Sequence, residues 1–389
     1  MTDPDLIETA ITRELLRGAL DLEHTPYGVL PHRLPGSARR WADPQLTFAA
    51  SQPSGGRLAF GTRSSVVRLV TVPTKQVYVG APPRPDGVYD LVVDGRLTAQ
   101  STASGGHRMT IDLTGGVQVT PGEPVAVAFT GLGDSDKEIE LWLPWNERTE
   151  LVALLTDEPV TPLPPPERLW LHHGSSISHG SYSDSPTATW PAVAAAAGAV
   201  GLVNLGFSGS ALLDPCVARA IRDTSADLIS LKLGINVVNA DSMRLRAFTP
   251  AVHGYLDTIR DGHPSTPLLL VSPVLCPLHE DVPGPTDMDL DELAHGRLRF
   301  RAAGDTADVS AGRLTLEVIR AELARIVAER RTDDPHLAHL DGRELYGPAD
   351  TAALPLPDGL HPSPAAQRLI GERFGRQVFG EGGIFHRNE

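Results

Sequence analysis

The segment Leu169-Trp170-Leu171-His172-His173-Gly174-Ser175-Ser176-Ile177 joins an apolar run to a turn of small residues. A short apolar run that ends in glycine and serine is typical of a buried strand followed by a turn. A serine on such a turn can be exposed above the edge of a sheet. Taken alone, a Gly-Ser-Ser turn more often has a structural role than a chemical one, so its meaning depends on the rest of the chain.

Downstream of this segment, apolar runs alternate with helical patterns. The predicted strands are 168–172, 202–205, 228–233, 268–272 and 337–340, and the predicted helices are 190–197, 215–222, 248–260, 315–330 and 364–379. Strands that alternate with helices indicate an α/β domain with a mostly parallel sheet, covered on both faces. Ligand sites on such sheets lie at the carboxyl ends of the strands.

The N-terminal part of the chain has a different pattern. Residues 6–20 carry apolar positions at mixed three- and four-residue spacing, which predicts a short amphipathic helix. From 46 to 155 the chain shows short strand-like runs separated by turn clusters, as in an all-β sandwich. Consecutive prolines predict a stiff linker over 161–167. We therefore expect a first domain over 1–160 and a second domain over 168–389.

Chemically useful residues follow the other predicted strands. The second strand leads into Asn204-Leu205-Gly206-Phe207-Ser208-Gly209, and the third leads into Leu233-Gly234-Ile235-Asn236. Glycine lets the backbone approach a ligand closely, and an asparagine amide can donate to an oxyanion. Each segment alone would usually be a turn, but together they mark successive strand ends.

The C-terminal segment Asp358-Gly359-Leu360-His361-Pro362 supplies the groups that a serine nucleophile needs. An aspartate and a histidine three residues apart can be presented together as an orienting carboxylate and a general base. With the serine turn at Ser176, the chain therefore contains the parts of an acyl-transfer site.

The order of these blocks resembles the SGNH hydrolases, also called the GDSL family, over roughly residues 168–380. The resemblance implies a flavodoxin-like catalytic domain, here preceded by a jelly-roll-like sandwich. It further implies that Ser176 is the nucleophile and that His361 is the base, with Asp358 as its partner. The implied oxyanion donors are the backbone N–H groups of Ser176 and Gly209 and the side chain of Asn236.

One position departs from the family pattern. The family usually has aspartate directly before the nucleophilic serine, and this chain has Ser175 there. Two adjacent serines are therefore candidates. We favour Ser176, because it aligns with the family's serine and precedes the aliphatic residue Ile177, and we expect the Ser175 side chain to hydrogen-bond the turn.

Composition excludes several other classes of function. The formal net charge of −14 argues against a general nucleic-acid or anionic-membrane surface, since either needs a basic face. The N-terminal residues show no export signal, so we expect a cytoplasmic protein in which Cys216 and Cys276 are reduced and buried. We expect His172, His173 and His179 to be structural or to line the substrate site rather than to bind a metal, and we expect no bound cofactor.

Three functions remain open at this point. Family members with a sandwich ahead of the catalytic domain include carbohydrate esterases and a smaller set of salicylyl-acyltransferase-type enzymes of antibiotic biosynthesis that use a CoA thioester. The resemblance favours acyl transfer from an acyl-CoA to a hydroxyl of a natural product, with ester hydrolysis as the alternative. A second alternative is a non-catalytic carbohydrate-binding protein, in which Trp142 and Trp145 stack on a sugar.

The stretch 279–312 is long for a connection within a compact domain. Loops of this length are usually functional or mobile. It either forms part of the acyl or acceptor pocket or is a helical excursion on the surface, and the sequence supports both interpretations equally.

Overall fold

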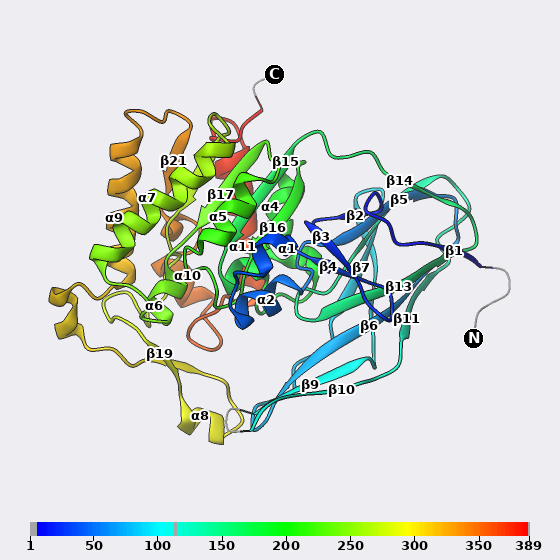
Figure 1. Ribbon diagram of the computed structural model, residues 1–389, viewed down its shortest axis with the longest axis horizontal. Coiled ribbons are helices and arrows are strands. Elements are labelled where there is room, and N and C mark those ends of the chain that lie inside the picture. The colour runs from blue at the N-terminus through cyan, green and yellow to red at the C-terminus, as the bar shows by residue number, and fades with distance from the viewer. Residues whose placement is uncertain (1–5, 113–114, 388–389) are drawn as a thin grey trace. The chain divides into compact units, whose positions relative to one another are not determined.

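The computed structural model describes residues 6–112 and 115–387, and in it the chain divides into two units (Figure 1). Residues 1–5, part of the stretch without an export signal, lie outside this description. The first unit takes in the residues up to Leu34, Ala50–Pro165 and Asp184–Thr187. The second takes in Pro35–Ala49, Pro166–Ser183 and the residues from Ala188 onward.

Within the described residues, the first unit forms two mostly antiparallel sheets, of eight and six strands. The eight-stranded sheet contains β1 (Ile7–Thr9), β3 (Asp21–His24), β4 (Val29–His32), β6 (Val66–Tyr78), β9 (His107–Asp112), β10 (Gly116–Thr120), β11 (Val125–Thr130) and β13 (Arg148–Thr156). The six-stranded sheet contains β2 (Leu16–Arg17), β5 (Arg57–Thr62), β7 (Val88–Val93), β8 (Arg96–Thr102), β12 (Lys137–Trp142) and β14 (Val160–Pro162).

Period-two alternation explains how these strands share one core. In β11, Val127 and Phe129 are buried while their neighbours are exposed, and in β12 Ile139 and Leu141 are buried. Since β11 and β12 belong to different sheets, the inward side chains of both sheets form a single hydrophobic cluster. Pro162 ends the edge strand β14, where a missing N–H is tolerated.

The predicted helix over 6–20 is wrong. This stretch contains the short strands β1 and β2, which pair with β13 and β5. Gly18 interrupts the stretch with a φ of +77°, and a Cβ at this position would lie 2.4 Å from the carbonyl oxygen of Gly55. Pairing with distant strands therefore outweighs the local apolar spacing.

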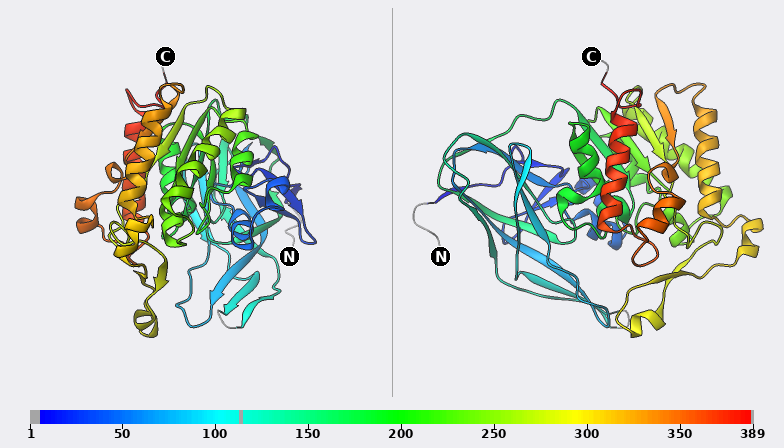
Figure 2. Two further views of the ribbon diagram at one scale, coloured as in Figure 1. Left: turned by 60° about the vertical axis from the view of Figure 1, so that its left-hand side comes forward. Right: turned by 180° about the vertical axis from the view of Figure 1, so that it is seen from behind.

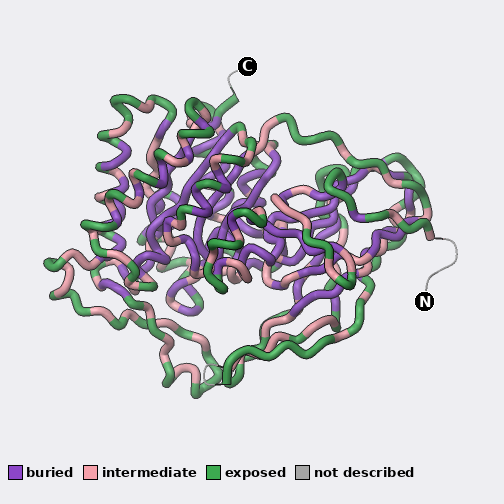
Figure 3. The backbone as a smooth tube through the Cα atoms, in the orientation of Figure 1, coloured by how far each residue is buried: buried purple, intermediate pink, exposed green. Residues whose placement is uncertain are grey.

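The second unit contains the predicted α/β domain. Its five described strands form an all-parallel sheet in the order β16 (Gly201–Gly206), β15 (Leu169–Gly174), β17 (Leu228–Lys232), β18 (Leu268–Val271) and β21 (Leu337–Leu340). Most of these strand residues are buried (Figure 3), as expected for strands covered on both faces. The prediction of a parallel-sheet α/β domain is confirmed.

Helices cover both faces of this sheet (Figure 2). The longer ones are α4 (Trp190–Ala197), α5 (Pro215–Arg222), α7 (Leu245–Gly262), α9 (Leu316–Arg330) and α11 (Pro364–Phe374). α4 packs against α11, and α5 packs against α7. Shorter elements of this unit are α1 (Gly36–Arg39), α2 (Pro44–Ala50), α3 (Ser176–His179), α6 (Ile235–Asn239), α8 (Leu290–Ala294), α10 (Pro348–Ala353) and the β19–β20 ribbon (Thr286–Met288 and Phe300–Ala302).

The N-terminal segment 35–49 belongs to the second unit, although it precedes most of the first in sequence. α1 packs against α5, and the Gln45 side chain donates a hydrogen bond to the backbone oxygen of Ser208 at 3.3 Å. The two units are therefore not two consecutive stretches of the sequence, as the predicted domain boundaries would require. None of the helices in residues 6–112 and 115–387 is both long and apolar enough to cross a lipid bilayer.

Candidate active site

Ser176 lies where the central strand β15 turns into the short helix α3. Ser175 precedes the helix in extended conformation, and its carbonyl oxygen accepts the N–H groups of Ser178 and His179 at 3.0 and 2.9 Å. Gly174 permits the close packing of this turn, since a Cβ there would lie 2.4 Å from the Ser178 hydroxyl. Ser176 is the first helical residue and keeps 8% of its surface exposed.

Asp358 and His361 lie in the loop between α10 and α11. One oxygen of Asp358, Oδ1, accepts the backbone N–H groups of Leu360 and His361 at 2.9 and 2.7 Å. The other, Oδ2, lies 2.7 Å from Nδ1 of His361, and Nε2 of His361 lies 2.9 Å from Oγ of Ser176. The structure thus joins the three predicted residues in one hydrogen-bonded chain.

The electrostatics of the hydrogen-bonded row Asp358–His361–Ser176 suit a histidine that acts as a general base. Burial by itself would raise the pKa of Asp358, whose carboxyl is completely buried. The hydrogen bond and charge of His361 and the two backbone N–H groups outweigh burial and lower the pKa of Asp358 below its ordinary value. The carboxylate therefore stays ionised at neutral pH, accepts the Nδ1 proton and leaves Nε2 unprotonated toward Ser176.

Asn236 lies in α6, directly after the strand β17 that neighbours β15. Its Oδ1 accepts the backbone N–H of Ala211 at 3.1 Å. This bond fixes the orientation of the amide, because only the oxygen can accept an N–H. The Nδ2 group, which donates, is therefore turned away from Ala211.

The loop that carries Gly209 is tied to the serine turn. The N–H of Phe207 donates to the carbonyl oxygen of Gly174 at 2.8 Å, and the N–H of Ser208 donates to Nδ1 of His179 at 3.2 Å. Gly209 has a φ of +70°, and a Cβ there would lie 2.0 Å from Nε2 of Gln45. The backbone conformation therefore favours glycine, and any other residue would also displace the end of the Gln45 side chain.

The expected role of the Ser175 side chain is wrong. Ser175 is completely buried, and its hydroxyl has no hydrogen-bond partner among the described residues. The turn is bonded instead by the Ser175 carbonyl. His361 faces Ser176 and not Ser175, so the geometry distinguishes the two adjacent serines.

The three histidines near the serine turn are buried and hydrogen-bonded within the fold. His172 bridges Ser230 and Ser178 through its two ring nitrogens, at 2.7 and 2.8 Å. Burial, with smaller effects from neighbouring positive groups, holds the pKa of His172 well below its ordinary value, so the ring is neutral. His173 bonds the carbonyl oxygen of Leu205, and His179 accepts from the backbone of Ser208. Across residues 6–112 and 115–387, no three His, Cys, Asp or Glu side chains are grouped so that they could hold a metal ion.

Two aromatic side chains that the sequence did not single out lie beside His361. The Tyr182 ring is stacked with the imidazole, with centroids 5.8 Å apart and an angle of 26°. The Phe300 ring meets it edge-on at 6.1 Å, and the Phe300 N–H donates to the Asp358 carbonyl oxygen at 2.9 Å. Tyr182 has a φ of +66°, a conformation that non-glycine residues adopt mainly where the surroundings impose it.

The position of Phe300 bears on the role of the long stretch 279–312. This stretch contains the β19–β20 ribbon and α8 rather than a purely helical excursion. Since β20 begins with Phe300, the ribbon reaches His361, the proposed general base. The arrangement favours the pocket interpretation of this stretch.

Outside this site, Trp142 does not offer an open face for a sugar. It is 7% exposed, the Arg57 guanidinium lies 4.5 Å from its ring centre, and its indole N–H donates to Glu140. Trp145 is half-buried. Cys216 and Cys276 are both free and buried.

Residues 169–275 match the model of the GDSL-like lipase/acylhydrolase family. These residues therefore form a GDSL-like domain, with the fold of the GDSL-type acyl hydrolases and transferases. Among solved structures, the chain is similar to the salicylyl-acyltransferase SsfX3 from a tetracycline biosynthetic pathway, with a TM-score of 0.76 and 25% identity over 95% of both chains. The similarity includes both units, as the sequence resemblance predicted.

Two further structures share the fold at lower identity. A GDSL-like lipase from Bacteroides ovatus has a TM-score of 0.66 and 17% identity, covering 95% of this chain and 96% of that one. A family two carbohydrate esterase from Cellvibrio japonicus has a TM-score of 0.56 and 12% identity over 96% of each chain. No protein of curated function matches the chain in sequence.

Proposed function

We propose that this protein is an acyltransferase that moves an acyl or aryl-acyl group from a CoA thioester to a hydroxyl of a natural product, through an acyl-enzyme on Ser176. The observation that carries the proposal is the hydrogen-bonded chain from Asp358 through His361 to Ser176, at 2.7 and 2.9 Å. A nucleophile within reach of a base that a third group orients is the arrangement required for covalent catalysis.

In the proposed first half-reaction, Nε2 of His361 takes the Ser176 hydroxyl proton while Oγ attacks the thioester carbonyl carbon. The backbone N–H groups of Ser176 and Gly209 and Nδ2 of Asn236 stabilise the developing oxyanion. The C–S bond then breaks, and His361 returns the proton to the departing thiolate. CoA leaves, and the acyl group remains as an ester of Ser176.

In the second half-reaction, the acceptor hydroxyl loses its proton to His361, and its oxygen attacks the acyl carbonyl. The bond from the acyl carbon to Oγ breaks, and His361 returns the proton to Ser176. Asp358 stabilises the imidazolium in both halves. If water takes the place of the acceptor, the same steps give ester or thioester hydrolysis.

Two observations support transfer of an aryl-acyl group over plain hydrolysis. Both SsfX3 and the carbohydrate esterase align over nearly the whole chain, but the similarity to SsfX3 is higher, with a TM-score of 0.76 and 25% identity against 0.56 and 12%. In addition, the rings of Tyr182 and Phe300 lie against His361, where an acyl group bound to Ser176 would meet aromatic surface. Aromatic groups stack favourably on such surface.

The test is to follow CoA release and product formation from salicylyl-CoA, benzoyl-CoA and acetyl-CoA, each with and without a polyketide or sugar alcohol. We expect acceptor-dependent CoA release and an ester product, and we expect Ser176→Ala to abolish both. Ser181→Ala, which changes a serine in the following loop, is the matched control. Release that never depends on acceptor would establish hydrolysis instead, and a protein whose Ser176 resists fluorophosphonate labelling would be a non-catalytic binder.

We also infer that the first unit is a β-sandwich of the jelly-roll type. Two sheets that enclose one hydrophobic cluster support this architecture.

A further inference from the structure

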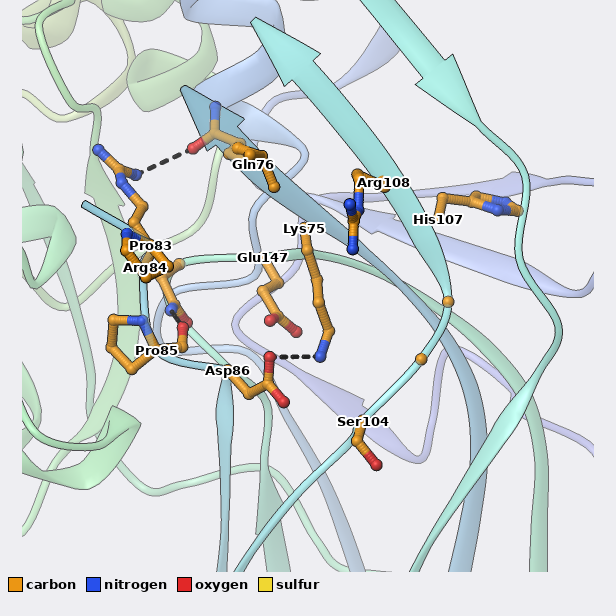
Figure 4. Close-up of a pocket in the computed structure, with 14 residues that line it drawn as sticks. Lys75, Gln76, Pro83, Arg84, Pro85, Asp86, Ser104, His107, Arg108 and Glu147 are labelled. Carbon is orange, nitrogen blue, oxygen red and sulfur yellow. Dashed lines mark hydrogen bonds and ion pairs between the residues drawn. The ribbon is translucent and has the colours of Figure 1, made fainter. Parts of the chain in front are cut away.

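The first unit contains a cavity of about 310 Å³ that lies entirely between its own strands and loops (Figure 4). Residues from four parts of the unit line it: β6, the loop before β7, the turn into β9 with the start of that strand, and the turn before β13. The lining side chains that matter here are Lys75, Asp86, Ser104, Arg108 and Glu147. This volume is at the lower end of the range for small-molecule sites, which suits a ligand of about one ring.

Glu147 is the feature that indicates a ligand. The residue is 3% exposed, and its Oε1 accepts the backbone N–H of Gly87 at 2.8 Å. Its Oε2 is buried and has no hydrogen-bond partner among the described residues. An unpaired buried carboxylate oxygen costs free energy, so a carboxyl in this position favours a ligand that brings a donor to Oε2, which no described residue bonds.

The position of this carboxyl is built into the fold. A Cβ on Gly87 would lie 2.7 Å from Oε2 and 2.6 Å from Pro144, so glycine is needed to make room for the carboxyl. Gly106, which also lines the cavity, has a φ of +77°, and a Cβ there would lie 2.2 Å from the carbonyl oxygen of Pro73. The close contact at Gly87 therefore fixes the place of the Glu147 carboxyl.

Both donor and acceptor groups line the cavity. The Lys75 ammonium pairs with Asp86 at 2.5 Å and donates to the Ala103 carbonyl at 2.6 Å. These two interactions use two of its three N–H groups, so the third can donate to a ligand. Arg108 also lines the cavity and is exposed. Burial raises the pKa of Glu147 to about 7, although the Gly87 N–H and Lys75 lower it, and the nearby charge of Asp86 raises it further. Above that pH, Oε2 is therefore an acceptor.

The mixture of charges selects the chemistry of the ligand. A cationic ligand would satisfy Glu147 but would meet Lys75, Arg84 and Arg108, and an anionic ligand would be repelled by Glu147 and Asp86. A hydroxyl group both donates and accepts, so adjacent hydroxyls can match an acceptor that lies beside a donor.

We propose that this cavity binds a vicinal diol of a sugar or cyclitol, with one hydroxyl donating to Oε2 of Glu147 and its neighbour accepting from Lys75. This site is separate from the residues of the acyl-transfer site, and its function does not depend on the proposed activity. The ligand can be a free ring or a ring within a polymer, since both present the same diol.

The test uses the full chain at pH 8 and measures binding by saturation-transfer NMR and calorimetry. The probes are myo-inositol and methyl β-D-glucopyranoside as free rings, dextran as a polymer, and cyclohexanol as a ring without a diol. We expect saturable binding of a diol probe and none of cyclohexanol. A preference for the free rings or for dextran identifies the form of the ligand.

Two variants and one control test the site itself. Glu147→Gln replaces the acceptor by a donor and should weaken binding at least about ten-fold, as expected for loss of a hydrogen bond to a charged group. Ser104→Trp, at an exposed position of the lining, should block binding without altering a buried group, and Glu138→Gln on the exposed face of β12 should leave it unchanged. Absence of saturable binding to every diol probe, equal binding of cyclohexanol, or full affinity in both lining variants would overturn the proposal.

Discussion

Replacing Asp358 by asparagine is the sharpest test of how His361 is held. Two backbone N–H groups point at Oδ1 of Asp358, at 2.9 and 2.7 Å. In Asp358→Asn the side-chain oxygen must take this position, because the amide nitrogen cannot accept an N–H. The NH₂ group then faces Nδ1 of His361, where Oδ2 now lies at 2.7 Å.

This exchange reverses the histidine tautomer. Facing an NH₂ donor, Nδ1 has to accept, so the ring proton moves to Nε2. Nε2 then donates toward Ser176 and can no longer take its proton. A wrong tautomer of this kind lowers turnover by about 10⁴ in a serine protease triad, and we expect a loss of about 10³ to 10⁴ here, or roughly 4 to 5.5 kcal/mol of transition-state free energy.

The assay is steady-state turnover of an acyl-CoA or an activated aryl ester, with Asp358→Ala measured alongside. The alanine variant removes the carboxylate but imposes no tautomer, so it should be no slower than the asparagine variant. Thermal melts confirm that both variants are folded. Turnover of Asp358→Asn within ten-fold of the wild type, or well above that of Asp358→Ala, would refute the tautomer argument.

Three further outcomes follow from the structure. Asn236→Ala should lower kcat by about 100- to 1,000-fold with little change in KM, since it removes an oxyanion donor; an effect confined to KM would contradict that role. Glu147→Gln should remove one contribution to the pH dependence of the unfolding free energy. Burial raises the pKa of Glu147 from 4.5 to about 7, so this group contributes stability at low pH that falls by up to about 3 kcal/mol as the pH rises through that interval. In urea titrations at pH 5 and pH 8, the unfolding free energy of the wild type should therefore fall relative to that of the variant by about that amount, because the buried neutral His172, which acts in the opposite direction, is common to both. Ser175→Ala should leave the unfolding free energy equal or raise it by about 1 kcal/mol, because no described residue bonds the removed hydroxyl. A loss of more than about 1 kcal/mol in the same titration would show that the hydroxyl is hydrogen-bonded in the folded protein.

Local patterns predicted the second unit well. The helices α4 and α5 begin and end at the predicted residues, and each strand of the parallel sheet lies within two residues of its predicted bounds. Strands buried on both faces are continuous apolar runs, which need no knowledge of their partners to be recognised. In contrast, β1 and β2 are two or three residues long and are strands only because β13 and β5 lie beside them.

The same distinction applies to the site. Ser176, Gly209, Asn236 and the Asp358–His361 pair stand next to strand ends or to one another, so local sequence reveals them. Tyr182 and Phe300 are single aromatic residues without a pattern, and only the folded chain brings them to His361. The Gln45 side chain contacts the Gly209 loop from a segment more than a hundred residues away in sequence. No local sequence pattern predicts this contact.

The serine at position 175 bears on the electrostatics of catalysis. Since this residue is completely buried and no residue in 6–112 or 115–387 bonds its hydroxyl, a carboxylate here would be either an unpaired buried charge or a neutral acid. A charged one would also oppose the oxyanion that forms next to it at Ser176. The neutral His172, which bridges Ser178 and Ser230, likewise adds no charge beneath the turn. The carboxylate of Asp358 therefore acts on the imidazolium from the side away from Ser176, and the oxyanion forms next to neutral donors.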